Sequence, residues 1–237
     1  MLLPQERIPW ILRVPAFRRE VLFRVRGGTC FSLSEAKPSV YLTFDDGPIP
    51  ESTPWLLKIL GEYDAKATFF MVADNARRYP ELFKAVVDEG HAIGNHTFHH
   101  KPPFRQTTAE LLADIRLADE TLGSLWVGGF PTAPRVRLFR PPHGLIHRWQ
   151  QKALHKAGYT VVMFDLNTLD YRPDRTPEQI LASVKANVRP GCIINMHDSL
   201  KSIGKLKQCL PEILDYLVSQ GYAMAPLPSG SSPDKSR

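Results

Sequence analysis

Short runs rich in β-forming residues alternate with amphipathic segments along most of this chain, and this alternation restricts the fold more than any other feature. The predicted strands are 39–44, 67–72, 91–94, 137–140, 160–165 and 192–196. The predicted helices are 53–62, 80–89, 107–122, 148–156, 177–187 and 206–218. Because parallel neighbours in a sheet need a long connection, usually a helix, the pattern predicts an α/β fold with a parallel sheet and crossover helices.

Polar clusters stand at the ends of five of these strands. They are 45–46, 96–100, 140–143, 165–170 and 197–198. In barrels of parallel strands, the catalytic side chains gather at the carboxyl ends of the strands. We therefore expect the five clusters to converge on one opening and to form a single site there.

The chain length of 237 residues suits one domain, which we place at 37–228. Residues 1–36 form a basic, partly amphipathic lead. Packing on the domain and peripheral contact with a membrane surface are both open for this lead. Residues 229–237 are rich in Ser, Gly, Pro and charge, so we expect a disordered tail.

Composition excludes several classes of protein. The net charge of +6 indicates a solvated basic surface or attraction to an anionic glycan, and no motif typical of nucleic-acid recognition is present. The three cysteines form no CxxC pair, which argues against a disulfide framework and against a cysteine zinc site. No transmembrane run or clear signal peptide is visible, so the cytoplasm is the default compartment, with membrane association as the alternative. The pattern leaves the oligomeric state unknown.

The strongest chemical pattern is a pair of histidines combined with a carboxylate. His96 and His100 are four residues apart and would share one face of a helical turn. Asp46 would add an oxygen ligand, and two imidazoles with one carboxylate are a familiar ligand set for a catalytic divalent metal. On spacing alone, His99 competes with His100 for the ligand role.

Asp45 and Asp46 precede Gly-Pro, and taken alone this sequence is typical of a turn. Beside a metal site the two carboxylates would divide the work, with Asp46 binding the metal and Asp45 accepting a proton from the attacking water. His197 follows an apolar strand, where a lone histidine is usually only a hydrogen-bonded structural residue. With Asp170 to orient and charge it, His197 would instead donate a proton to a leaving amine.

Arg140 stands between apolar residues in Phe-Arg-Pro-Pro-His and is expected to be buried. A buried guanidinium needs a carboxylate partner, and Asp45 is the one we predict. The pair would keep Asp45 ionised and correctly aimed. The two prolines that follow would stiffen the loop and hold the backbone N–H of His143 toward a developing oxyanion.

Five segments, in this order, carry these candidate residues. They are Thr43-Phe44-Asp45-Asp46-Gly47-Pro48, His96-Thr97-Phe98-His99-His100, Arg140-Pro141-Pro142-His143-Gly144, Asn167-Thr168-Leu169-Asp170-Tyr171 and Asn195-Met196-His197-Asp198. Together they resemble the motifs of the polysaccharide deacetylases with a NodB-homology domain, carbohydrate esterase family 4. The resemblance extends over residues 40–227, and the second motif, His-(Ser/Thr)-x-x-His, assigns the ligand role to His100 rather than to His99.

The resemblance implies a distorted (β/α) barrel with about seven parallel strands, fewer than the full eight. It implies a zinc-type ion held by Asp46, His96 and His100, for which Zn²⁺ is expected and Co²⁺, Ni²⁺ or Mn²⁺ are alternatives. It also implies an aspartate base, Asp45, and a histidine acid, His197.

Three of the motifs depart from the family pattern. Asn167 and Tyr171 replace an aspartate and a tryptophan, Asn195 replaces a leucine, and His143 replaces an aromatic residue after the prolines. In the family the leucine is expected to line the pocket for the acetyl methyl group. We therefore place Pro142, His143, Tyr171 and Asn195 on the substrate side, and the departures bear on the substrate more than on the chemistry.

The expected function is metal-dependent hydrolysis of the N-acetyl group of an amino sugar, with release of acetate. The expected partner is an N-acetylated glycan, either a polysaccharide or a glycoconjugate of the chitin-oligomer or peptidoglycan type. One alternative is an amide hydrolase of the same fold that acts on a small non-glycan amide, which Asn195 keeps open. The other is a non-catalytic glycan-binding module, which would usually have lost the base or a metal ligand, and neither is lost here.

Overall fold

The computed structural model describes residues 29–30, 38–126 and 137–228. Most of the N-terminal lead and the whole C-terminal tail lie outside these residues, so the predictions for them stay predictions. Within the described part of the chain, no helix is both long enough and apolar enough to cross a membrane.

Nine strands form one sheet in the described residues, and every pairing between them is parallel. They are β1 (Thr29–Cys30), β2 (Ser39–Asp45), β3 (Ala67–Met71), β4 (Ala92–Asn95), β5 (Arg137–Phe139), β6 (Tyr159–Val162), β7 (Leu166–Asn167), β8 (Ile193–His197) and β9 (Ala223–Met224). Their order is β1-β6-β5-β4-β3-β2-β8-β7, and β9 pairs with the start of β2. In the described residues the path ends at β1 and β7 without pairing them, so the barrel stays open.

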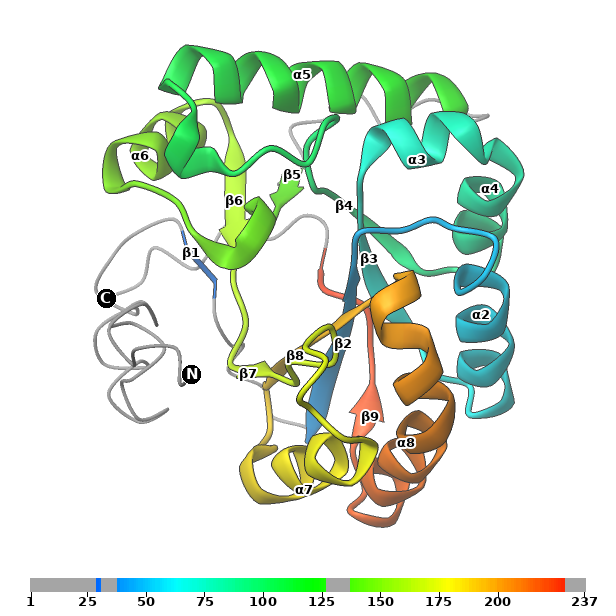
Figure 1. The fold of residues 1–237 in the computed structure, drawn as a ribbon. Helices are drawn as coiled ribbons and strands as arrows, with labels where there is room; N and C mark the ends of the chain where they lie inside the picture. The colour runs from blue at the N-terminus through cyan, green and yellow to red at the C-terminus, as the bar shows by residue number, and fades with distance from the viewer. Residues whose placement is uncertain (1–28, 31–37, 127–136, 229–237) are drawn as a thin grey trace.

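Helices surround the strands on the outside of this curled sheet (Figure 1). They are α2 (Thr53–Glu62), α3 (Ala73–Arg78), α4 (Pro80–Asp88), α5 (Thr108–Leu125), α6 (Arg148–Lys156), α7 (Pro177–Asn187) and α8 (Leu200–Ser219), with the 3-10 turns η3 (Pro103–Arg105) and η4 (Pro142–Gly144). The arrangement confirms the predicted distorted barrel of parallel strands with crossover helices.

Strand β2 decides which side chains face the inside of the barrel. Leu42 and Phe44 belong to the large apolar cluster between the strands and the helices, whereas Tyr41 belongs to a smaller cluster built mainly from strand residues. Successive side chains of a strand point to opposite faces, so Thr43 and Asp45 share the inner face with Tyr41. The strand period therefore directs Asp45 into the barrel.

Strand β8 repeats this pattern beside β2. Ile194 packs in the outer cluster and Ile193 in the inner one, so Asn195 and His197 face inward. The parallel register pairs Asp45 with His197. One carboxylate and one imidazole thus point into the same space at the carboxyl ends of neighbouring strands.

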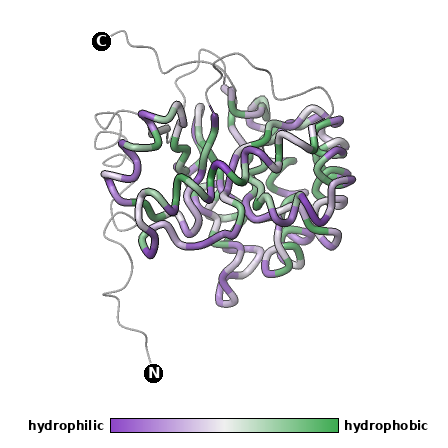
Figure 2. Tube along the Cα trace, turned by 90° about the horizontal axis from the view of Figure 1, so that it is seen from above, coloured by the Kyte–Doolittle hydropathy of each residue, from purple (hydrophilic) through white to green (hydrophobic). Residues whose placement is uncertain are grey.

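Hydropathy follows this layering. In Figure 2, hydrophobic segments gather among the strands and on the helix sides that face them, and hydrophilic segments lie around the periphery. Phe44, Leu60, Phe69 and Leu210 of the outer cluster have no exposed surface. Burial of apolar area, worth roughly 25 cal/mol per Å², holds the helices against the sheet.

The predicted elements differ from the observed ones mainly in short segments. Helices α2, α6 and α7 have the predicted bounds. Helix α8 begins at Leu200 rather than at residue 206, because Ser202 and Ile203 are buried and tertiary packing outweighs a weak local pattern. Strand β6 ends at Val162 rather than at residue 165. Helix α3 and the strands β1, β7 and β9 were not predicted, since segments this short carry too little periodicity.

Candidate active site

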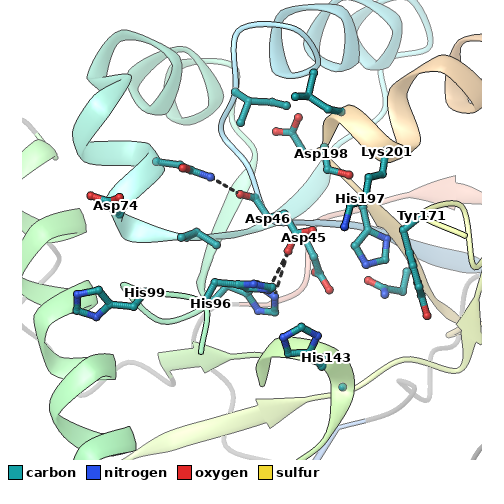
Figure 3. Close-up of a pocket in the computed structure, with 18 of the residues that line it drawn as sticks. Asp45, Asp46, Asp74, His96, His99, His143, Tyr171, His197, Asp198 and Lys201 are labelled. Atoms are coloured by element: carbon teal, nitrogen blue, oxygen red, sulfur yellow. Dashed lines mark hydrogen bonds and ion pairs between the residues drawn. The ribbon is translucent and has the colours of Figure 1, made fainter. Parts of the chain in front are cut away.

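A pocket of about 670 Å³ opens at the carboxyl ends of β2, β4 and β8 (Figure 3). Most of the side chains predicted for the site line it. They are Asp45, Asp46, His96, His100, His143, Tyr171, Asn195 and His197. Arg140 and Asp170 are fully buried and contact Asp45 and His197 from behind this surface. The strand ends therefore converge on one opening, as predicted.

Asp46, His96 and His100 form a compact group in the pocket. One possible ligand atom of each lies within 4.8 Å of the other two. Oδ1 of Asp46 is 3.1 Å from Nε2 of His100 and 3.6 Å from Nε2 of His96. Burial alone would raise the pKa of Asp46, but hydrogen bonds with His100 and His96 and the charges of His96 and His197 hold it well below its ordinary value. An ionised carboxylate and two imidazole nitrogens thus converge, as a divalent cation requires.

The histidine pair does not lie on a helix, contrary to the expectation from its spacing. Residues 96–100 form a loop after β4, and Thr97 and His100 have positive φ angles of 67° and 54°. Oδ1 of Asn95 accepts a hydrogen bond from the Thr97 N–H at 2.8 Å, and the Thr97 hydroxyl accepts one from the His100 N–H at 3.0 Å. A tight hydrogen-bonded loop, rather than a helical turn, brings the two imidazoles together.

His96 has a fixed ring orientation. Its Nδ1 lies 2.8 Å from the carbonyl oxygen of Arg140, which can only accept a hydrogen bond, so Nδ1 is the donor. With Nδ1 engaged in this way, Nε2 is the ring nitrogen that faces Asp46. Hydrogen bonds of this kind orient the histidines of metal sites.

His99 lies apart from this group. Its Nδ1 is 2.5 Å from Oδ1 of Asp114 on α5, and Figure 3 shows its ring well separated from those of His96 and His143. Among the described residues, the group able to hold a metal includes His100 and leaves out His99. The geometry therefore favours the same histidine as the family motif does.

Arg140 is fully buried and pairs with Asp45, as expected. Nη1 of its guanidinium donates to three inward-facing side chains. The acceptors are Asp45 Oδ1 at 2.8 Å, Thr43 Oγ1 at 2.7 Å and Asn195 Oδ1 at 2.9 Å. The guanidinium also lies over the Phe70 ring, 4.1 Å from its centroid. Packing and hydrogen bonds together fix this arginine, and the arginine fixes the Asp45 carboxylate.

Both carboxylate oxygens of Asp170 bind His197. Oδ1 lies 2.8 Å from the ring Nδ1, and Oδ2 accepts a hydrogen bond from the backbone N–H at 2.8 Å. Burial lowers the pKa of His197, but the charge and hydrogen bond of Asp170, with the charges of Asp45 and Asp46, raise it to about 9. The imidazolium is therefore the main form of this ring at neutral pH.

The residues predicted on the substrate side do not all reach the pocket. His143 and Tyr171 line it, whereas Pro142 is buried beside it. The Tyr171 ring meets His197 edge-on with the centroids 4.8 Å apart. The His143 ring lies 5.0 Å from that of His100. The Tyr171 and His143 rings therefore lie beside His197 and His100 respectively.

Asn195 both lines the pocket and belongs to the arginine network. A guanidinium only donates hydrogen bonds, so the amide oxygen of Asn195 must face Arg140. A leucine here could not accept that bond. The replacement of leucine by asparagine thus gives Arg140 an additional acceptor next to Asp45.

Two further residues, Asn75 and Asp198, bind the aspartate pair. Nδ2 of Asn75, on the unpredicted helix α3, donates to the Asp46 carbonyl at 2.8 Å. Asp198 donates its backbone N–H to the Asp45 carbonyl at 2.8 Å and accepts a hydrogen bond from the Thr53 hydroxyl at 2.7 Å. Burial raises the pKa of the Asp198 carboxyl to about 7. Both residues line the pocket and hold the backbone of the aspartate pair there.

Backbone strain gathers around the site. Six non-glycine residues in the described chain have positive φ, and five of them belong to or adjoin the predicted site residues. They are Asp46, Thr97, His100, His143 and Leu169. Each such conformation is unfavourable by on the order of 1 kcal/mol and persists only where the surrounding structure imposes it, commonly at functional sites.

Comparisons with known proteins agree with this geometry. The polysaccharide deacetylase family model matches residues 33–162. A chitooligosaccharide deacetylase from Azorhizobium caulinodans is 31% identical over 216 residues, which cover 85% of this chain and 98% of that protein. A peptidoglycan-N-acetylglucosamine deacetylase from Bacillus cereus is 37% identical over 185 residues, which cover 77% of this chain and 83% of that protein.

Solved structures of similar proteins share the fold. A peptidoglycan N-acetylglucosamine deacetylase superposes with a TM-score of 0.73 at 30% identity, covering 85% of this chain and 91% of that one. A family 4 carbohydrate esterase from Streptomyces lividans, solved with acetate, gives 0.71 at 28% identity and covers 83% and 98%. The chain therefore belongs to the polysaccharide deacetylases, the carbohydrate esterases of family 4 with a NodB-homology domain, and is an enzyme of the hydrolase class.

Proposed function

We propose that this chain hydrolyses the N-acetyl group of an amino sugar within a glycan and releases acetate, with a divalent metal ion as its cofactor. The acetyl carbon gains the oxygen of water, and the sugar nitrogen leaves as an amine with an added proton. One observation carries the proposal. Asp45 and His197 lie side by side in register on β2 and β8, in the pocket that also holds the Asp46, His96 and His100 group.

The donor atoms of Asp46, His96 and His100 fit a divalent cation, and so do the charge and the orientation of these side chains. The Asp46 carboxylate is ionised, and the His96 ring is fixed by the Arg140 carbonyl with Nε2 toward the carboxylate. Two imidazoles and one carboxylate make up a catalytic zinc set that leaves positions open, so Zn²⁺ is the first candidate, with Co²⁺, Ni²⁺ or Mn²⁺ as alternatives. A bound ion would polarise the acetyl carbonyl and acidify water in the pocket.

Asp45 is the group placed to accept a proton from the attacking water. Arg140 binds its Oδ1 and stays fully buried, so the carboxylate is held in one orientation at the pocket wall. A positioned base of this kind contributes typically about 10²- to 10⁴-fold to the rate.

His197 is the group placed to protonate the leaving nitrogen. Asp170 binds Nδ1 and raises the pKa of the ring to about 9, so the ring holds a proton at neutral pH, and its Nε2 is the remaining donor. An amine is a poor leaving group unless it is protonated. Amide cleavage therefore depends on this donor more than cleavage of an activated ester does.

The relatives and the pocket support this substrate class. Two relatives are named for deacetylating chitooligosaccharides and peptidoglycan N-acetylglucosamine. In this chain Tyr171 is 37% exposed beside His197 and offers an aromatic face to a sugar ring. The His143 backbone N–H would bind the oxyanion, with Pro142 fixing its loop, and Asn195 would contact the acyl group.

Acetate release tests the proposal. Purified protein should release acetate from N-acetylglucosamine oligomers or from peptidoglycan, lose this activity on thorough chelation and regain it with Zn²⁺, Co²⁺, Ni²⁺ or Mn²⁺. Full activity after verified metal removal would contradict the metal. Hydrolysis of a small cyclic amide, with no acetate from any glycan, would instead favour the non-glycan amide hydrolase.

A further inference from the structure

Two segments of the chain that follow pocket residues each expose an aromatic ring. After His100, the chain enters η3, where Phe104 is 43% exposed. After His143, it enters α6, where Trp149 is 62% exposed. Within the described residues, neither ring belongs to a hydrophobic core cluster. An isolated exposed ring is ordinary. Two exposed rings on neighbouring segments that both start at one pocket call for an explanation.

Gln150, at the start of α6, joins the two segments by hydrogen bonds. It has no exposed surface, and its Nε2 donates to the carbonyls of Pro103 at 2.9 Å and Gln106 at 3.0 Å. Pro103 directly precedes Phe104, and Gln150 directly follows Trp149. The backbones that carry the two exposed rings are therefore held side by side by a buried side chain.

The Trp149 ring is held flat. It stacks on the His147 imidazole with the centroids 4.2 Å apart and the planes at 11°. The backbone N–H of His147 donates to Oε1 of Gln150 at 3.1 Å, so the same glutamine also fixes this support. One face of the indole is covered and the other stays available. A ring fixed in advance loses less side-chain entropy when it binds a ligand.

We propose that Phe104, His147 and Trp149 form an aromatic platform that binds the outer sugar units of the glycan whose acetylated sugar occupies the pocket. The inference rests on the proposed function. A pyranose ring has an apolar C–H face that packs on a flat aromatic surface, while its hydroxyls need polar partners at the edge. His147 offers a ring nitrogen, and the Arg105 guanidinium lies 5.9 Å from the Phe104 ring centroid.

The position of the platform fits one continuous ligand. Trp149 is six positions after His143, so their Cα atoms are at most about 20 Å apart, a distance that a few sugar units span. A lipid surface would take up protruding apolar side chains, whereas the stacked indole lies flat on an imidazole. The platform would therefore favour long oligomers over short ones.

Chain-length dependence tests this proposal. We would compare Trp149→Ala, Trp149→Phe and Phe104→Ala with the control Val218→Ala, which removes an exposed apolar side chain from α8. For the N-acetylglucosamine hexamer, Trp149→Ala should raise KM on the order of tenfold with kcat unchanged. The dimer should be cleaved equally by all variants, and Trp149→Phe should retain most of the affinity for the hexamer.

Direct binding separates this proposal from the proposed function. Calorimetric titration of the hexamer and the dimer into Asp45→Asn and into Asp45→Asn with Trp149→Ala needs no turnover. Hexamer binding that Trp149→Ala weakens supports the platform even if no acetate is ever released. The platform is refuted if Trp149→Ala changes the affinity for dimer and hexamer equally, or changes neither affinity. It is also refuted if Asp45→Asn alone does not bind the hexamer. Binding to phosphatidylglycerol vesicles that is lost in Trp149→Ala, with hexamer affinity unchanged, would assign the surface to a membrane instead.

Discussion

Asp45 and Asp46 are adjacent, yet their side chains lie in different parts of the site because the backbone turns between them. Asp45 ends β2 with its side chain on the inner face, where Arg140 holds it. Asp46 has a φ of 82°, and its carboxylate lies beside His96 and His100 instead. The left-handed conformation is unfavourable for an aspartate, so the hydrogen bonds around it must maintain it.

Substitution of each aspartate should separate the proposed role of Asp45 as a base from that of Asp46 as a metal ligand. Asp45→Asn should keep metal affinity and lose at least about 10²-fold in kcat, because the base is gone while the ligands remain. Asp46→Asn should mainly weaken metal affinity. Metal content and kcat would be measured at saturating metal, and equal metal loss in both variants would contradict the division.

Metal titration can distinguish whether His99 or His100 is the second histidine ligand of the metal. His100→Ala should lower metal affinity at least about 10²-fold, since it removes a ligand. His99→Ala should bind metal nearly normally, although it leaves the buried Asp114 without its ring partner and so destabilises the fold. Affinity measured by competition with a chelating dye decides between them. The reverse order of affinities would assign the ligand role to His99 and not to His100.

The proton of His197 should set the alkaline limit of activity. Its pKa is raised to about 9, so the imidazolium is present below that pH and is lost as the pH rises through it. Asp170→Asn removes the charge that raises this pKa, and the alkaline limb of kcat should move to lower pH. His197→Ala should damage cleavage of an amide far more than that of an activated acetyl ester. If Asp170→Asn leaves the alkaline limb unmoved and His197→Ala slows cleavage of both substrates equally, then His197 has only a structural role.

Among the elements, helix α5 shows how local sequence fixes a boundary far from the chemistry. Thr107 accepts a hydrogen bond from the Glu110 N–H at 3.3 Å, and Oε2 of Glu110 accepts one from the Thr107 N–H at 2.7 Å. This reciprocal capping box begins the helix that carries Asp114, the partner of His99. A short local motif thus positions an interaction at the edge of the site.

Removal of this cap should lower stability without changing the chemistry. Thr107→Ala should reduce the free energy of unfolding by about 1 kcal/mol, because the Glu110 N–H loses its acceptor. The control Thr121→Ala, on the exposed side of the same helix, should change it by less than about 0.5 kcal/mol. Urea denaturation compares the two variants. Equal effects of both substitutions would show that the cap does not hold the helix.

Across the whole molecule, the site joins parts of the barrel that are remote in sequence. Asp46 follows β2, His96 and His100 follow β4, and the three ligand atoms come within 4.8 Å of one another. A metal bound by all three would bind the folded chain and not the unfolded one. Its affinity would therefore add to the stability of the whole domain.

Metal should accordingly raise the unfolding temperature. At a free Zn²⁺ concentration of about 100 times the dissociation constant, the folded state gains about 2.7 kcal/mol. Differential scanning calorimetry of metal-free and metal-loaded protein measures this gain. Asp46→Asn should lose most of the shift while Asp45→Asn keeps it, and an equal shift in both would indicate metal binding elsewhere.

The sequence alone determined the class of fold and pointed to most residues of the candidate site. Strand and helix periods are local, and a polar residue at the end of an apolar run is visible without any tertiary contact. The bounds of α2, α6 and α7 followed from such signals. The motif spacing likewise identified Asp45, Asp46, His197 and the histidine segment 96–100.

Tertiary structure alone decided how those residues meet. The histidine pair comes together through a hydrogen-bonded loop, whereas its spacing indicated a helical turn. Asn75 binds the Asp46 carbonyl from a helix that is too short to leave a period in the sequence. The contacts of Arg140 with Thr43 and Asn195 join residues that are far apart along the chain. Such contacts depend on strand register and side-chain direction across the barrel, which arise only when the strands pair.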